Sequence, residues 1–264
     1  MRPIFLWMTG LSVLLLAASC QKVINLKVGD SSPRVVIEGR VTDSLQPWTV
    51  LVSKTIPFEA STRLDAVSGA RVGIRDLTAG TTDSLTETAP GMYALPTAKA
   101  GIAGHTYEMH VTTPEGTYTA TSTLPARVPV DSVRIETSAA FGRKAAQIFV
   151  VFTDPPGIPN YYRFLIWANG EVQRSEARDD RYSDGRLNGR PSILAYDDEK
   201  NIGSGTVVRI DMQGIDESTH KYFSTLGNAD GNSAAPANPV TNIKGGALGY
   251  FGAFSVQELR IVLP

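Results

Sequence analysis

Residues 106–122 read TYEMHVTTPEGTYTATS, and apolar and polar side chains alternate on both sides of Pro114-Glu115-Gly116. Alternation with a period of two predicts strands that bury one face. A proline and a glycine between two such runs are typical of a hairpin turn. The stretch therefore predicts antiparallel β structure.

The same alternation occurs in several short runs upstream of this hairpin. Each run is bounded by Gly, Pro, Asp or Ser, and the runs lie at 35–41, 49–54, 70–76 and 91–95. About six short antiparallel strands over roughly 90 residues predict a β-sandwich. We expect a first domain at 34–125, with an immunoglobulin-like or transthyretin-like sandwich fold.

A second β-rich region follows Pro125 and Pro129, which prevent continuous strand pairing. Strands are predicted at 131–136, 146–152, 161–167, 206–212 and 256–263. A helix is predicted at 214–229, with Asp216 or Ser218 as its cap, an apolar face that includes Ile215, and Gly227 as its end. We expect a mostly β protein with two β-sandwich domains in tandem, the second at 126–264.

Residues 169–204 interrupt the second domain with a stretch rich in Asp, Arg and Gly. A loop of this length in a compact domain is usually functional or disordered. We therefore interpret 169–204 as a long polar insertion.

The N-terminus has the features of a secretory signal. Arg2 precedes an apolar segment, and Ala17-Ala18-Ser19 precede Cys20, the single cysteine. A cysteine directly after small residues resembles a bacterial lipobox, in which Cys20 becomes the first mature residue and carries lipid. The alternative is an ordinary signal peptide followed by an unmodified cysteine. We expect a signal peptide at 1–19 and a lipidated tether at 20–33.

Composition argues against several classes of function. The chain of 264 residues carries 25 basic and 26 acidic side chains, a balance that argues against a nucleic-acid binder. Lipidation of Cys20 leaves no thiol for disulfides, catalysis or metal binding. The three histidines lie in no nucleophile or zinc motif. We expect no catalytic residue, no cofactor and no metal.

Two segments stand out as candidate sites. Residues 179–185 resemble a calcium-binding loop, but their spacing does not match an EF-hand and nearby arginines offset the charge, so we interpret them as a solvated polar loop. Tyr182 and Tyr196 lie in the polar insertion, where exposed aromatic side chains are typical of binding surfaces. We predict Tyr182, Asp184 and Tyr196 as binding residues. The glycine-rich run 245–252 predicts a tightly packed, bulged segment.

A family resemblance rests on several motifs in order. Residues 238–255, NPVTNIKGGALGYFGAFS, have an asparagine-proline start, a glycine pair and then Gly-x-Phe-Gly. Together with the motifs at 35–39, 69–72, 91–93, 161–162 and 184–185, this stretch resembles the family called domain of unknown function forty-two forty-nine. Separately, Gly69-Ala70-x-Val72-x-Ile74 with Gly91-x-Tyr93 is similar to the carboxypeptidase-regulatory, transthyretin-like sandwich.

The resemblance implies an outer-membrane lipoprotein of Bacteroidota-type bacteria, whose gene lies beside that of a TonB-dependent receptor. It implies no catalytic residues. We expect a non-enzymatic accessory protein in nutrient binding or uptake, anchored to the outer membrane through lipid on Cys20. No acidic residue lies at 21–25, so the periplasmic and cell-surface faces both stay open. The alternatives are a hydrolase of polysaccharide or peptide with carboxylates in 169–204, or a structural envelope protein.

Overall fold

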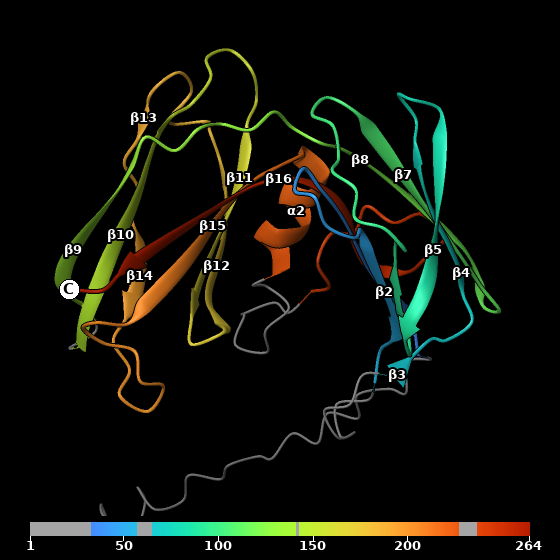
Figure 1. Ribbon diagram of the computed structural model, residues 1–264, viewed down its shortest axis with the longest axis horizontal. Helices are drawn as coiled ribbons and strands as arrows, with labels where there is room; N and C mark the ends of the chain where they lie inside the picture. The colour runs from blue at the N-terminus through green and yellow to red at the C-terminus, as the bar shows by residue number, and fades with distance from the viewer. Residues whose placement is uncertain (1–32, 57–64, 141–142, 227–236) are drawn as a thin grey trace, which may run out of the picture. The chain divides into compact units, whose positions relative to one another are not determined.

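The computed structural model describes residues 33–56, 65–140, 143–226 and 237–264. The predicted signal peptide, Cys20, most of the tether and Gly227 lie outside these residues. The described chain is built of β-strands with one α-helix, α2, so the predicted mostly β class is confirmed (Figure 1). Within these residues, no helix is both long and apolar enough to span a membrane.

The described residues of the first half form eight strands. They are β1 (Val35–Thr42), β2 (Thr49–Lys54), β3 (Asp65–Ala66), β4 (Arg71–Asp76), β5 (Thr81–Ala89), β6 (Met92–Ala94), β7 (Thr106–Thr113) and β8 (Gly116–Thr123). The predicted hairpin at 106–122 is confirmed as the antiparallel pair β7–β8. Strand β5 pairs with β4 through 81–85 and with β6 through 86–89, so this one strand belongs to both layers of the sandwich.

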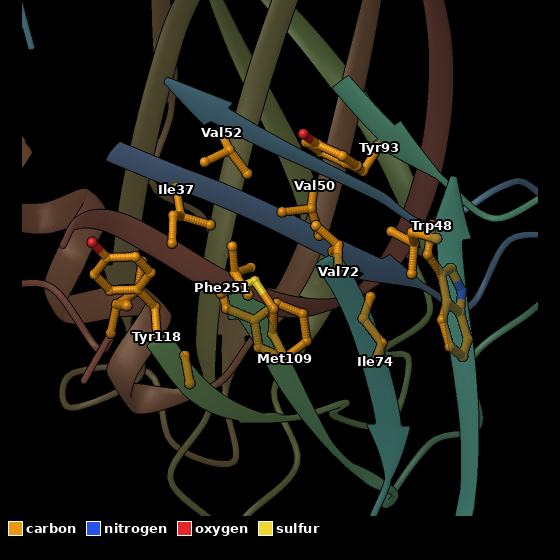
Figure 2. Close-up of a cluster of buried hydrophobic side chains, with 14 of the residues drawn as sticks. Ile37, Trp48, Val50, Val52, Val72, Ile74, Tyr93, Met109, Tyr118 and Phe251 are labelled. Atoms are coloured by element: carbon orange, nitrogen blue, oxygen red, sulfur yellow. The ribbon is translucent and has the colours of Figure 1, made fainter. Parts of the chain in front are cut away.

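Buried side chains from both layers form the first core (Figure 2). Ile37, Met109 and Phe251 are among its fully buried members. Gly39 on β1 makes room for two of them, since a Cβ there would lie 2.8 Å from Met109 Sδ and 2.8 Å from Phe251 Cδ2. The core therefore depends on a glycine as well as on large apolar side chains.

The second half contains the remaining elements. They are β9 (Ser132–Ala140), β10 (Arg143–Thr153), β11 (Tyr161–Ala168), β12 (Glu171–Asp179), β13 (Leu187–Asn188), β14 (Ser192–Ala195), β15 (Val207–Ile215), α2 (Glu217–Leu226) and β16 (Leu248–Val262). The sheet β12-β11-β15-β16 faces the smaller sheet of β9, β10, β13 and β14 across a second core, which includes Phe152, Phe164 and Ile210.

Strand β16 takes part in both sandwiches. Residues 248–254 pair in parallel with β1, and residues 255–262 pair antiparallel with β15. Phe251 and Ala253 belong to the first core, while Leu259 and Ile261, on the same face of the strand, pack against the second. The predicted division at residue 125 therefore does not separate the two cores, because the C-terminal strand completes the first sheet.

The predicted strand at 256–263 is the second half of β16, and the glycine-rich run is its first half. Gly249 has a φ of +95°, and a Cβ there would lie 2.0 Å from the carbonyl oxygen of Ile37. Tight packing of this segment is confirmed. The two halves were predicted as separate segments because glycines weaken strand propensity, whereas here Gly249 permits close approach of the β1 backbone.

Helix α2 is shorter than the predicted 214–229. Ile215, predicted on the helix, ends strand β15 and belongs to a third small core with Tyr222, Tyr250 and Phe254. Asp216 is confirmed as the cap, because its Oδ1 accepts a hydrogen bond of 2.8 Å from the backbone N–H of Thr219. The helix packs on the face of the β11-β15-β16 sheet opposite the second core (Figure 1).

The polar stretch 169–204 is not one long loop, since it contains β12, β13 and β14. Strand β12 pairs with β11 along the edge of the sheet and buries only one of its side chains, so its residues EVQRSEARD carry no apolar alternation. Buried Arg178 holds the stretch together by donating hydrogen bonds to the carbonyl oxygens of Arg190 and Pro191 and to Ser192 Oγ. The interpretation of 169–204 as a loop is therefore wrong.

Candidate functional site

Three aspartates from two loops converge at one end of the second sandwich. Asp154 directly follows β10, and Asp180 and Asp184 lie between β12 and β13. One carboxylate oxygen of each lies within 4.8 Å of one from each of the others. Asp154 is fully buried, Asp180 is 8% exposed and Asp184 is exposed.

The strand pairing explains why these loops meet. Residues Phe152 and Thr153 at the end of β10 pair with β13, and Tyr161 at the start of β11 pairs with Asp179 at the end of β12. The loop 154–160 therefore runs beside the loop 180–186. The backbone N–H of Asp154 donates to the carbonyl oxygen of Arg186 at 3.1 Å, which fastens one loop to the other.

Each carboxylate is held through one oxygen. The Tyr162 hydroxyl donates to Asp154 Oδ1 at 2.5 Å, and the backbone N–H of Asn160 donates to Asp180 Oδ2 at 2.6 Å. The backbone N–H of Gly157 donates to Asp184 Oδ1 at 2.7 Å.

Electrostatics at the cluster are unfavourable for three separate negative charges. Burial raises the pKa of Asp154 above its usual value of 3.8, and the charges of Asp180 and Asp184 raise it further. The hydrogen bond from Tyr162 and the backbone N–H of Gly185 oppose this increase in the pKa. The arginines that flank Asp180 in sequence bind other carboxylates: Arg178 pairs with Glu176, and Arg181 pairs with Asp179. The three carboxylates have no ion pair with a described lysine, arginine or histidine.

Gly185 permits the close contact of the two loops. Its φ is +67°, and a Cβ at this position would lie 2.9 Å from Pro156 Cβ. A larger residue here would separate the loop that holds Asp184 from the loop that follows Asp154.

The structure places the three predicted binding residues in different settings. Tyr182 is 87% exposed, in the loop between Asp180 and Asp184. Asp184 joins the carboxylate cluster. Tyr196 packs against the second core, and its hydroxyl donates to the carbonyl oxygen of Pro264 at 2.8 Å. Tyr196 thus binds the backbone of Pro264. Among the described residues, its ring makes no contact with the ring of Tyr182.

Asp154 and its partner Tyr162 were not predicted as site residues from the sequence. The available signal was the turn Asp154-Pro155-Pro156-Gly157 at the end of an apolar strand, which places a carboxylate at a sheet end. Nothing in the sequence linked that turn to residues 179–185, because the link depends on the pairing of β10 with β13 and of β11 with β12.

Buried polar groups also lie on the sheet face beneath α2. Arg163 and Gln213 are register partners on β11 and β15, and Arg163 stacks 3.6 Å from the centroid of the Phe223 ring. Gln213 is 1% exposed, and neither atom of its amide has a hydrogen-bond partner among the described residues. A water molecule or a polar ligand at this point would satisfy the Gln213 amide.

None of the three histidines belongs to the carboxylate cluster. His105 Nδ1 is 2.8 Å from Asp76 Oδ2, and His110 Nε2 is 2.6 Å from Glu108 Oε2, both in the first sandwich. The ring of His220 lies 5.0 Å from that of Tyr161. Among the described residues, no histidine nitrogen shares a hydrogen bond with a serine or threonine hydroxyl.

These features define a β-sandwich protein with two cores that share one strand and with a carboxylate cluster at the loops of the second. The chain belongs to the family described as "Domain of unknown function (DUF4249)", whose model matches residues 21–260. This confirms the predicted family.

Comparison with solved structures finds proteins similar to this chain. No curated protein matches the chain. A two-domain fibronectin type-III segment from chicken tenascin is similar at a TM-score of 0.23 and 10% sequence identity, covering 87% of this chain and 98% of that one.

Proposed function

We propose that this protein is a non-enzymatic lipoprotein of the outer membrane that assists a TonB-dependent receptor in nutrient binding or uptake. The anchoring part of the proposal rests on Cys20 directly after Ala17-Ala18-Ser19. The receptor partner rests on the resemblance of the whole mature chain to lipoproteins encoded beside such receptors. The proposal names no nutrient, because the receptor would select it.

The observation that carries the binding role is the setting of Tyr182. Its side chain is 87% exposed, although Asp180 and Asp184 on either side are fixed by hydrogen bonds to the neighbouring loop. An exposed aromatic ring on a rigid loop offers a large contact area that loses little conformational entropy on binding. Ile158 and Leu187 are both exposed and lie in or beside the same two loops. They add apolar surface to this end of the second sandwich.

The hydrolase alternative has one observation in its favour. Carboxylates from 169–204 do lie close to another carboxylate, and burial raises the pKa of Asp154, as a general acid would require. Glycoside hydrolysis needs two carboxyl groups on either side of the substrate. Asp154 is fully buried and therefore has no surface for a substrate, which favours a structural or ion-binding role for the cluster.

The partner is tested by crosslinking in intact cells of the native organism, recovery through a C-terminal tag and mass spectrometry. We expect a TonB-dependent receptor as the dominant partner of the wild type. Tyr182→Ala should reduce recovery of the receptor about tenfold or more. Leu45→Ala is the matched control, because Leu45 is 76% exposed in the first sandwich. Absence of a receptor, or equal recovery with Tyr182→Ala, would contradict the proposal.

The anchor is tested separately. Cys20→Ser should abolish incorporation of labelled fatty acid and release the protein from the membrane fraction, since several acyl chains together supply durable attachment. Ser19→Ala retains a small residue before the cysteine and should still be lipidated. Unchanged labelling of Cys20→Ser would show that the cysteine is not the lipidation site.

A further inference from the structure

We propose that Asp154, Asp180 and Asp184 bind a calcium ion that joins the loop 154–160 to the loop 180–186. The site lies at the end of the second sandwich, and its test does not require the receptor partner proposed above. Its ligands come from two loops, so the ion would add a connection between them to the backbone hydrogen bond of Asp154 with Arg186.

Charge balance supports a bound cation. Three carboxylates with oxygens within 4.8 Å of one another repel strongly in a partly buried setting. The adjacent arginines are occupied by Glu176 and Asp179. A divalent ion would supply the missing positive charge.

Unpartnered oxygens supply a second, independent observation. Tyr162 binds Oδ1 of Asp154, while Asp154 Oδ2 is buried and has no hydrogen-bond partner among the described residues. Asp180 and Asp184 each accept a backbone hydrogen bond through one oxygen, Oδ2 and Oδ1 respectively. Their other carboxylate oxygens accept no hydrogen bond from the described residues. Burial of a carboxylate oxygen that accepts no hydrogen bond is unfavourable in free energy. Such an oxygen has lone pairs that can bind a metal ion.

The donor set and its spacing favour calcium over other metals. All three side chains offer oxygen, whereas zinc sites use mainly nitrogen and sulfur. Calcium binds oxygen at about 2.3–2.6 Å, so two ligands of one ion lie at most about 5 Å apart, and the observed limit of 4.8 Å meets this condition. Magnesium requires shorter bonds and a regular octahedron, which this irregular pair of loops does not supply.

Binding of the ion has a consequence for the exposed tyrosine. Tyr182 lies between two of the ligands in sequence, and its loop is fastened to residues 154–160 at both ends. Calcium would therefore add to the hydrogen bonds that hold the Tyr182 loop, by drawing Asp180 and Asp184 toward Asp154.

The test uses the full chain purified in detergent and treated with EDTA. Calcium should raise the melting temperature by about 5–10 °C at a concentration 100 times the Kd. Terbium, which occupies calcium sites, should show luminescence on excitation of tyrosine, because the Tyr162 hydroxyl is 2.5 Å from Asp154 Oδ1. Calcium should displace this signal.

Asp184→Asn is the informative variant, because Asp184 is exposed and the asparagine Oδ1 can still accept the hydrogen bond from Gly157. It should lose the calcium-dependent increase in melting temperature and most of the terbium signal. Asp198→Asn removes the same charge from an exposed position in another loop and should respond like the wild type. An unchanged melting temperature in the wild type, an equal response in Asp184→Asn, or a response to magnesium but not calcium would overturn the proposal.

Discussion

Ser122 donates a hydrogen bond of 2.7 Å from its Oγ to Oδ2 of Asp216, the residue that caps helix α2. The same Ser122 Oγ accepts a bond of 2.8 Å from the backbone N–H of Ala253 on β16. Asp216 thus connects the helix to the first sandwich, and Ser122 extends the connection to the strand shared by both cores. Ser122 is buried, and Asp216 is half-buried.

Replacement of Asp216 should destabilise the protein through both connections. Asp216→Ala removes the helix cap and leaves the buried Ser122 hydroxyl without its acceptor, which should lower the free energy of unfolding by about 2–3 kcal/mol. Asp216→Asn keeps an oxygen for the Thr219 N–H and should give a smaller loss. Urea denaturation followed by circular dichroism measures both, and equal losses would show that the cap contributes little.

Gly249→Ala should be strongly destabilising. A Cβ at this position meets the Ile37 carbonyl oxygen at 2.0 Å, and φ is +95°, so the variant must either separate β16 from β1 or distort the backbone. We expect a loss of about 2–4 kcal/mol in the free energy of unfolding. Gly246→Ala is the matched control, because φ is +89° there but nothing lies within 4 Å of the added Cβ. It should lose about 1 kcal/mol, from backbone strain alone. Comparable losses for the two variants would contradict the steric argument.

Arg178→Met should destabilise the segment that contains β12, β13 and β14. Arg178 is 7% exposed and forms an ion pair with Glu176. Its removal leaves the Glu176 carboxylate without its more buried partner. The carbonyl groups of Arg190 and Pro191 lose their hydrogen-bond donor as well. We expect a loss of about 3 kcal/mol and faster amide hydrogen exchange at 190–195. Arg181→Met removes an exposed arginine paired with Asp179 and should give no measurable change. Unchanged exchange at 190–195 in Arg178→Met would refute the role of Arg178.

Asp76 should make stability depend on pH in acid. Burial acts to raise its pKa, but hydrogen bonds from His105 and from the backbone N–H groups of Ala79 and Thr78 outweigh burial and lower the pKa below the usual 3.8. A lowered pKa in the folded state adds stability that is present above pH 3.8 and is lost as the pH falls through the folded value. Asp76→Asn should lower the free energy of unfolding by about 1–2 kcal/mol at pH 6.

The difference between wild type and Asp76→Asn should shrink as the pH is lowered from 4 to 3. Urea denaturation of both proteins at a series of pH values measures this. A difference that grows on acidification would show that burial, and not hydrogen bonding, dominates at Asp76.

The sequence by itself determined the elements that repeat a simple local pattern. The hairpin 106–122, the strands at 35–41 and 146–152 and the cap at Asp216 were predicted, because alternation, turn residues and capping depend on neighbours in the chain. Cys20 and the family motifs are likewise local and needed no tertiary information.

Only the tertiary structure decided which distant segments meet. Strand β12 and the first half of β16 lack apolar alternation or contain glycines, and they become strands because an adjacent strand supplies their hydrogen bonds. The cluster of Asp154, Asp180 and Asp184 arises in the same way, from the pairing of β13 with β10 and of β12 with β11. A carboxylate has the same sequence signature in a solvated loop as in an ion site, because its chemistry depends on the charges that the fold brings within a few ångströms.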